Sequence, residues 1–422
     1  MNMHDAPVQQ ALSGDLLLRT ATDTEDVHRV AEFNGQIHGR GVVDMTLDLF
    51  LRHPHTRLTD LLYVEDIHSK VIVSSLCLIP WQIAYDNVTF TSGEMGIVGT
   101  LEPYRRRGLI RAQVDLFRRR LRDRGCVLSH IQGIAYYYRQ FGFEYAMPLE
   151  GGIVITQRDV PKHENMMPYT FRQANQNDIP VLTLLFETAA EDPLIHVIRD
   201  EPTWRYLLER NTQSDMDAET WIVLNAQGHV AGYFRLPEHH FGEELTVNEA
   251  SKLSFESAWA VLDELIELAE QHHTPGVRLC LPQQSDLMRV ARSFGVRDLG
   301  TYAWQIMMPS PVDFLQTIAT ALESRITRSI FAGLTRDLTI SFFRYGVRLH
   351  FEAGRLTNVT YLDQPDHSDM HMPPNAFAPL ALGYRSFDEL RTNYPDAGVS
   401  PACRLFVDTL FPRSASFLYT IY

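Results

Sequence analysis

A short loop rich in arginine and glycine is the part of this 422-residue chain best suited to chemistry. Arg105, Arg106 and Arg107 precede Gly108, and an apolar helical pattern begins just after it. The first N–H groups of a helix have no partner within the helix, and the helix dipole makes that end positive. Together with the arginines, these donors suit an anion and above all a pyrophosphate. The loop therefore predicts the binding of a nucleotide-like cofactor.

Two regular elements must hold this loop in place. The apolar run at residues 95–100 predicts a strand before it, and four apolar residues between 110 and 121 recur with the spacing of one helical face after it. Gly125 stands where a left-handed residue commonly ends a helix. The sequence thus predicts a strand, a phosphate-binding turn and a helix in this order.

The loop and a second element together resemble a known family. The spacing Arg105-x-x-Gly108-x-Ile110 resembles the R/Q-x-x-G-x-G/A signature of the GNAT N-acetyltransferases, which bind acetyl-CoA. Residues 136–144, Y-Y-Y-R-Q-F-G-F-E, resemble the Y-x-x-x-G-F element that closes the GNAT domain. The bulky Ile110 stands where the signature ends in Gly/Ala, and in this the loop resembles the Eis-like (enhanced intracellular survival) branch of the family. Because both elements occur in order, the resemblance is favoured over a basic helix start on a protein surface.

The resemblance implies roles for individual residues. It implies that backbone amides at residues 98–100 contact the acetyl carbonyl and the pantetheine, as preorganised donors that stabilise an oxyanion. It implies that Tyr138 is the general acid for the leaving thiolate, since a phenol with a pKa near 10 stays protonated at neutral pH. The alternative is that Tyr138 only packs. The implied cofactor-binding residues are Val98, Gly99, Thr100, Arg105, Arg106, Arg107, Gly108, Leu109, Ile110, Arg111, Gly133 and Ile134.

A base must also be present, because an alkyl amine has a pKa of about 10.4 and must lose a proton to react. In Eis-like enzymes the base is the C-terminal carboxylate, which here belongs to Tyr422. The apolar residues 416–422 predict a last strand that docks and does not fray. The alternative is a strand that merely finishes a sheet, with a solvated carboxylate. Asp44, Asp48 and Glu94 are acidic residues that could instead meet the amine.

The composition favours a soluble cytoplasmic enzyme. The chain is 45% hydrophobic, yet it has no apolar run of about 18 residues and no hydrophobic signal core at its start. Its 4 cysteines lie far apart, which argues for reduced thiols and against zinc. Residues 366–371, D-H-S-D-M-H, lack partner ligands elsewhere, so no metal is expected. The net charge of −14 argues against nucleic acid and favours cationic partners, although it also serves solubility alone.

Two short matches recur at one spacing. The pattern R-x-A occurs at Arg19 and again at Arg172, 153 residues later. The two R-x-F-G segments that begin at Arg139 and Arg292 have the same separation. We infer two copies of one fold. The offset places residues 258 and 261, an alanine and a valine, opposite the arginine and glycine of the loop. The second copy is therefore predicted to lack the cofactor loop.

The resulting division has three parts. The fold class is α+β (mixed α/β), with tandem GNAT folds, one active and one degenerate, followed by a domain that resembles the sterol-carrier-like C-terminal domain of Eis-like enzymes. In that last domain a helix is predicted at 312–326, with strands at 338–343, 347–352 and 356–361. The predicted domains are the GNAT acetyltransferase domain with the acetyl-CoA site at 1–156, the degenerate GNAT-like domain at 157–308, which opens with a linker to 168, and the sterol-carrier-like domain at 309–422.

The sequence therefore predicts an acetyl-CoA-dependent N-acetyltransferase of the Eis-like type. The acetyl group would pass to a primary amine of a cationic small molecule or a lysine-containing peptide. Resemblance to Eis-like proteins implies a hexamer, with no membrane or nucleic-acid partner. The alternative is a non-catalytic acyl-CoA-binding or regulatory protein.

Overall fold

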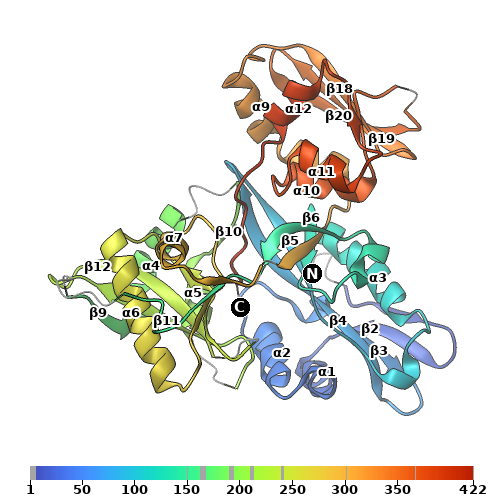
Figure 1. The fold of residues 1–422 in the computed structure, drawn as a ribbon. Coiled ribbons are helices and arrows are strands. Elements are labelled where there is room, and N and C mark those ends of the chain that lie inside the picture. The colour runs from blue at the N-terminus through green and yellow to red at the C-terminus, as the bar shows by residue number, and fades with distance from the viewer. Residues whose placement is uncertain are drawn as a thin grey trace.

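The computed structural model describes residues 6–149, 151–161, 168–189, 194–209, 213–238, 242–300, 302–365 and 367–421. Figure 1 shows a first part in blue to cyan beside a second part in green to yellow, with a C-terminal part in orange to red above them. The predicted linker at 157–168 lies half outside the described residues. Among the helices of the described residues, none is both long and apolar enough to cross a membrane.

A nine-stranded sheet forms the centre of the first part. Its strands follow the order β1-β2-β3-β4-β5-β6-β17-β7, and β10 pairs with β4. The strands are β1 (Gln9–Ala11), β2 (Leu16–Thr20), β3 (Leu61–Asp66), β4 (Ile72–Tyr85), β5 (Val88–Thr100), β6 (Leu128–Ile131), β7 (Glu144–Leu149), β10 (Ile195–Ile198) and β17 (Tyr302–Met307).

Helices cover both faces of this sheet. Helix α3 (Leu109–Asp123) packs with Leu78 of β4, whereas α1 (Thr24–His38) and α2 (Gly41–Leu51) pack with Ile79 on the opposite face. Neighbouring residues of a strand point to opposite faces, so the buried β4 contributes to two cores. The predicted helix after Gly108 is confirmed, and Gly125 follows its end with a left-handed φ of +66°.

The second part holds two four-stranded sheets, ordered β14-β12-β11-β9 and β13-β15-β8-β16. In the sequence, helix α6 connects the part of the chain that holds β13 to β15, and these two strands pair in parallel. In the same way, α3 comes between β5 and β6 in the sequence, and those strands also pair in parallel. The two parts thus share an order of elements. The strands are β8 (Ile153–Ile155), β9 (Thr170–Gln173), β11 (Ala218–Leu224), β12 (Val230–Pro237), β13 (Leu245–Val247), β14 (Glu249–Ala250), β15 (Val277–Leu279) and β16 (Arg297–Asp298), and the helices are α4 (Ile179–Ala189), α5 (Glu201–Leu208), α6 (Phe255–Gln271) and α7 (Asp286–Ser293).

Three strands lie in a sheet other than the one that the predicted boundaries assign to them. β8, before the boundary at 156/157, pairs with β15 and β16 of the second part. β10 and β17, after that boundary, join the sheet of the first part. Five of the six residues of β17 are buried, and the strand lies between β6 and β7.

The described residues of the C-terminal part form a five-stranded sheet, β20-β19-β18-β21-β22, with five helices. The predicted helix at 312–326 is divided at the buried Ile318 into α8 and α9, and both halves bury apolar residues. The three predicted strands are confirmed. The elements are α8 (Pro311–Thr317), α9 (Ala319–Thr327), β18 (Arg336–Ser341), β19 (Tyr345–Glu352), β20 (Arg355–Asp363), β21 (Met370–His371), α10 (Phe377–Ala381), α11 (Phe387–Asn393), β22 (Gly398–Val399) and α12 (Arg404–Leu410).

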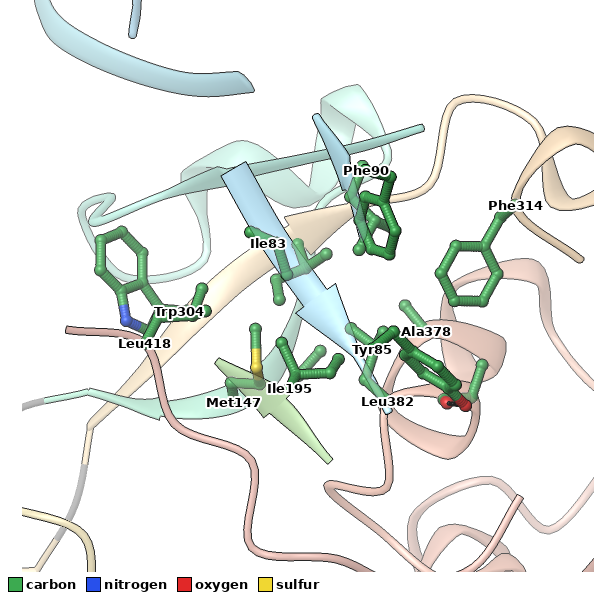
Figure 2. Close-up of a cluster of buried hydrophobic side chains, with 14 of the residues drawn as sticks. Ile83, Tyr85, Phe90, Met147, Ile195, Trp304, Phe314, Ala378, Leu382 and Leu418 are labelled. Carbon is green, nitrogen blue, oxygen red and sulfur yellow. Dashed lines mark hydrogen bonds between the residues drawn. The ribbon is translucent and has the colours of Figure 1, made fainter. Parts of the chain in front are cut away.

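The segment after α12 is not the predicted strand. Residues 412–421 form an extended tail without ladder pairing, and the tail descends from the C-terminal part between the other two parts (Figure 1). Its backbone bonds single groups instead: the Phe417 amide donates to the Ile195 carbonyl at 3.3 Å. Leu418 is buried near Trp304 and Met147 (Figure 2). Burial of side chains, and not a sheet, therefore holds the tail.

Candidate active site

The arginine–glycine loop leads directly into α3. Gly108 is the residue before the helix and has a left-handed φ of +76°, a conformation that glycine adopts readily. No side chain caps this helix start, and within the described chain no group accepts from the amides of Leu109, Ile110 and Arg111. A Cβ on Gly108 would meet no atom within 4 Å. The first turn of α3 thus offers free donors beside an open approach.

The arginines at this end of α3 differ from those at its other end. Arg105, Arg106 and Arg107 are exposed, and among the described residues no carboxylate pairs with them. In contrast, Arg118 donates to the Phe141 carbonyl at 2.8 Å, and Arg124 is paired with the buried Asp60. Arg105, Arg106 and Arg107 therefore remain available for an anion at this end of the helix.

The strand before the loop separates from its neighbour. β5 and β6 pair in parallel only up to the rung of Glu94 and His130. Further along, β5 has a bulge: Ser75 of β4 pairs with Gly99 and Cys77 with Gly96, so Ile97 and Val98 have no partner residue in β4. Ile97 has a φ of +47°. The end of β5 is thus set apart from β6, with irregular backbone at the predicted acyl-contact residues.

Residues of α1 and β4 hold Gly99 and Thr100 in place. A Cβ on Gly99 would lie 3.2 Å from Ile37 of α1, so the close approach of that helix favours glycine here. The hydroxyl of Ser74 lies 2.9 Å from the Gly99 carbonyl and 2.8 Å from the Thr100 hydroxyl. These contacts fix the position of the strand end before the loop.

Tyr138 lies in a short 3-10 turn, Tyr137–Phe141, and is only 6% exposed. Burial raises the pKa of its phenol well above the ordinary value, so the hydroxyl keeps its proton at neutral pH. Its ring packs on Gly133, where a Cβ would lie 2.3 Å from a ring carbon. The side chains of Tyr302 and Gln305 donate to the Gly133 carbonyl at 2.7 and 3.0 Å. Gly133 therefore helps to position the ring of Tyr138. The next residue, Ile134, is 70% exposed.

The arginine–glycine loop and the turn of Tyr138 are neighbours. The guanidinium of Arg111, in the first turn of α3, lies 5.7 Å from the ring centre of Phe141, in the turn of Tyr138. The structure thus brings together two elements that are about thirty residues apart in the sequence.

A buried histidine that the sequence did not indicate, His130, lies beside the candidate acidic residue Glu94 at the point where β5 and β6 separate. His130 Nε2 is 4.0 Å from Glu94 Oε2, and His130 Nδ1 is 3.0 Å from Ser92 Oγ. The rings of Trp81 and Trp304 contact the imidazole at 4.5 and 5.0 Å between centres. Burial lowers the pKa of His130 to about 3, so the ring is neutral. No motif marks these residues, because they meet only through strand pairing.

The candidate bases lie in different surroundings. Tyr422 is outside the described residues, and the tail is described up to the buried Ile421. Asp48 is ion-paired with Arg52 at 2.9 Å, whereas Asp44 is half-buried. Asp366 of the loop considered for a metal also lies outside the described residues, and the described residues hold no group of three metal ligands.

The start of the second helix corrects the predicted offset. α6 begins at Phe255 after Ser254, so Ser254, and not Val261, stands where Gly108 stands in the first part. The Ser254 hydroxyl accepts from the Ser257 amide at 3.1 Å. Because a side chain caps this helix, fewer amides are free in its first turn than in that of α3.

Comparison with known proteins places this site in a class. Residues 42–146 match the family described as acetyltransferase (GNAT) domain. No curated protein matches the chain in sequence. The match covers the strand β5, the loop, α3 and the turn of Tyr138.

The fold is similar to that of solved structures over almost the whole chain. A probable N-acyltransferase of unknown function from Enterococcus faecalis V583 gives a TM-score of 0.70 at 13% identity, over 97% of this chain and 100% of that one. A GCN5-related N-acetyltransferase from Anabaena variabilis ATCC 29413 gives 0.68 at 12% identity, over 96% and 99%. Eis1 from Mycobacterium abscessus gives 0.62 at 15% identity, over 96% and 100%.

The domain match and the fold define the class of protein. The chain is an acyltransferase enzyme that carries a GNAT acetyltransferase domain in a mixed α/β fold. The GNAT fold binds acyl-CoA, and the free donors at the start of α3 fit the phosphates of such a ligand.

Proposed function

We propose that the protein is an acetyl-CoA-dependent N-acetyltransferase of the Eis-like type. The observation that carries the proposal is the start of α3, where unpartnered amides, unpaired arginines and the open side of Gly108 occur together beside the turn of Tyr138. Backbone donors and guanidinium groups are the partners that a pyrophosphate requires. The cofactor-binding residues remain those that the sequence predicted.

The proposed reaction forms one bond and breaks one. The amine nitrogen attacks the acetyl carbon of the thioester, a C–N bond forms and the C–S bond breaks. The base takes one proton from the amine, and Tyr138 gives one proton to the leaving thiolate. The products are an N-acetyl amine and the free thiol of coenzyme A.

Tyr138 suits the acid role because its phenol stays protonated and its position is fixed. Its ring lies in the turn next to the start of α3 and packs on Gly133, whose carbonyl is held by two side chains. Backbone donors at residues 98–100 would stabilise the oxyanion that forms on the acetyl oxygen. The bulge in β5 supports this assignment, because it removes Ile97 and Val98 from the ladder with β4.

The proposed base is the C-terminal carboxylate of Tyr422. It is supported by the buried tail, whose Leu418 packs close to Trp304 (Figure 2). Trp304 also contacts His130, which lies beside Glu94. Glu94 lies at the last paired rung of β5 and β6, and it is the next candidate if the terminus is not the base.

The acceptor we propose is a primary amine of a cationic small molecule or a lysine-containing peptide, which the net charge of −14 would attract. By resemblance we further propose a degenerate second GNAT-like domain, a sterol-carrier-like third domain, a hexameric assembly and a cytoplasmic location.

A thiol-release assay tests the proposed function. Acetyl-CoA and the protein are combined with polyamines, aminoglycosides or lysine peptides, and free thiol is measured over time. Release that depends on an amine supports the transferase. Tight binding of acetyl-CoA without amine-dependent release would indicate an acyl-CoA-binding protein instead.

A further inference from the structure

A fully buried arginine between β10 and α5 holds the C-terminal tail. Arg199 directly follows β10, and its side chain has no exposed surface. Its two terminal nitrogens donate to the two carboxylate oxygens of Glu249 at 2.7 and 2.6 Å. The same guanidinium donates to the Thr420 carbonyl at 2.6 Å. Arg199 thus joins β14 of the second part to the tail.

Aromatic residues enclose this contact. The guanidinium lies 4.3 Å from the ring centre of Phe186 and 4.8 Å from that of Trp204. Tyr419 packs on Phe186 with ring centres 6.1 Å apart. The pKa of Tyr419 is raised far above its ordinary value by burial, so its hydroxyl stays neutral. The guanidinium makes three hydrogen bonds and contacts two aromatic rings. A planar guanidinium can make this set of contacts, and the ammonium group of lysine cannot.

The charges around Glu249 do not balance. Arg235, also buried, lies 3.7 Å from the same carboxylate, and Tyr233 donates its hydroxyl to it at 2.7 Å. Glu249 therefore has two cationic neighbours, and it keeps one of them if Arg199 is replaced. Since removal of one partner of a buried pair is costly mainly when the other is left alone, the second part should tolerate the replacement.

We propose that Arg199 is a positioning residue that fixes the end of the tail. This rests on the proposed function, in which the Tyr422 carboxylate is the base, two residues beyond the anchored Thr420. The second part, whose helix α6 is capped by Ser254, would then contribute to catalysis by holding the base in place. The tail crosses from the C-terminal part to the second part, so the site would draw on all three parts of the chain.

Access of carboxypeptidase to the tail tests the anchor. Wild type, Arg199→Lys and Arg199→Met are digested, and release of the last residues is followed by mass spectrometry, with the melting temperature measured in parallel. Arg325→Lys is the matched control, because Arg325 also donates to a backbone carbonyl of the C-terminal part, that of Leu410, which precedes Thr420 by 10 residues in the sequence. We expect release from both Arg199 variants to be at least about tenfold faster than from the control.

The same variants separate positioning from folding. If the tail carries the base, kcat should fall by about 10–100-fold while the KM for acetyl-CoA stays unchanged, because a displaced catalytic group mainly lowers kcat. Folded Arg199 variants with a protected tail would overturn the anchor. A released tail with unchanged kcat would leave the anchor standing and would contradict Tyr422 as the base.

A second measurement needs no substitution. In the wild type, hydrogen exchange of the amides at 419–421 should be as slow as in the neighbouring strand β10, because an anchored buried segment opens only with its surroundings. Fast exchange at these amides would overturn the anchor even if the Arg199 variants fail to fold.

Discussion

Gly108 and Gly125 stand at opposite ends of α3 in the same left-handed conformation, with φ values of +76° and +66°. At both positions a Cβ would meet no atom within 4 Å. Only Gly108 borders the free amides of the first helical turn. The two glycines therefore separate the cost of backbone strain from the effect on phosphate binding.

Gly108→Ala should weaken acetyl-CoA binding by about 10–100-fold, because a methyl group would stand where the pyrophosphate approaches the backbone. Gly125→Ala should leave binding unchanged. Both variants should lose about 1 kcal/mol of unfolding free energy, since each places a Cβ at a positive φ. Calorimetric titration with acetyl-CoA and denaturant unfolding measure the two effects. Equal affinity in both variants would count against the site.

Tyr138→Phe should lower turnover by about 10²–10⁴-fold with little change in acetyl-CoA affinity, as expected for loss of a general acid. Because the phenol stays protonated far into the alkaline range, the wild type should show no loss of turnover from this group up to about pH 10. Tyr137→Phe is the control, since the neighbouring ring is more exposed. A Tyr138→Phe enzyme with full turnover shows that the tyrosine only packs.

A few residues added after Tyr422 should abolish turnover in a folded protein, because they replace the carboxylate by an amide that cannot accept the proton. Deletion of Tyr422 should do the same, since it withdraws the carboxylate by about 3.3 Å. The same extension placed before residue 1 is the control. Circular dichroism and gel filtration confirm fold and assembly. Full activity of the extended protein would transfer the role of base to a side chain, with Glu94 the first to test.

His130→Gln should make the protein less sensitive to acid. Burial lowers the pKa of His130 to about 3, whereas an unfolded histidine titrates near 6.5. Between these values the unfolded chain binds a proton that the folded chain does not, so stability falls as the pH falls, by about 1.4 kcal/mol per pH unit for this residue. The variant should lose that part of the slope.

Denaturant unfolding at several pH values between 6.5 and 4 measures this slope. His53 is an internal comparison, because burial lowers its pKa to about 3 as well. The effects of His53→Gln and His130→Gln should therefore add in the double variant. An unchanged slope in His130→Gln would mean that the imidazole is not kept neutral.

The local features of the site could be predicted from the sequence. The glycine before α3, the arginines and the turn of Tyr138 are encoded by residues close together in the chain, and the structure forms the elements around them as expected. The helix spacing also placed the end of α3 at Gly125 correctly, because a left-handed residue there needs no distant partner.

Features that depend on distant pairing could not be predicted. Nothing in the apolar residues of β17 shows that the strand lies between β6 and β7, since any uncovered sheet edge would accept it. Glu94 and His130 meet only because β5 and β6 pair in that register. The apolar tail resembled a strand, but its side chains are buried by neighbours from three parts of the chain, without a ladder.

The central claim is that acetyl groups pass from acetyl-CoA to an amine in this site. Its most direct test is a single-turnover experiment with the wild-type protein, in which coenzyme A thiol and N-acetylated amine are both quantified. The account predicts that the two products appear together in equal amounts and only when an amine acceptor is present. Thiol that appears at the same rate with and without amine, or acetyl-CoA that binds and stays intact with every amine tested, would contradict it.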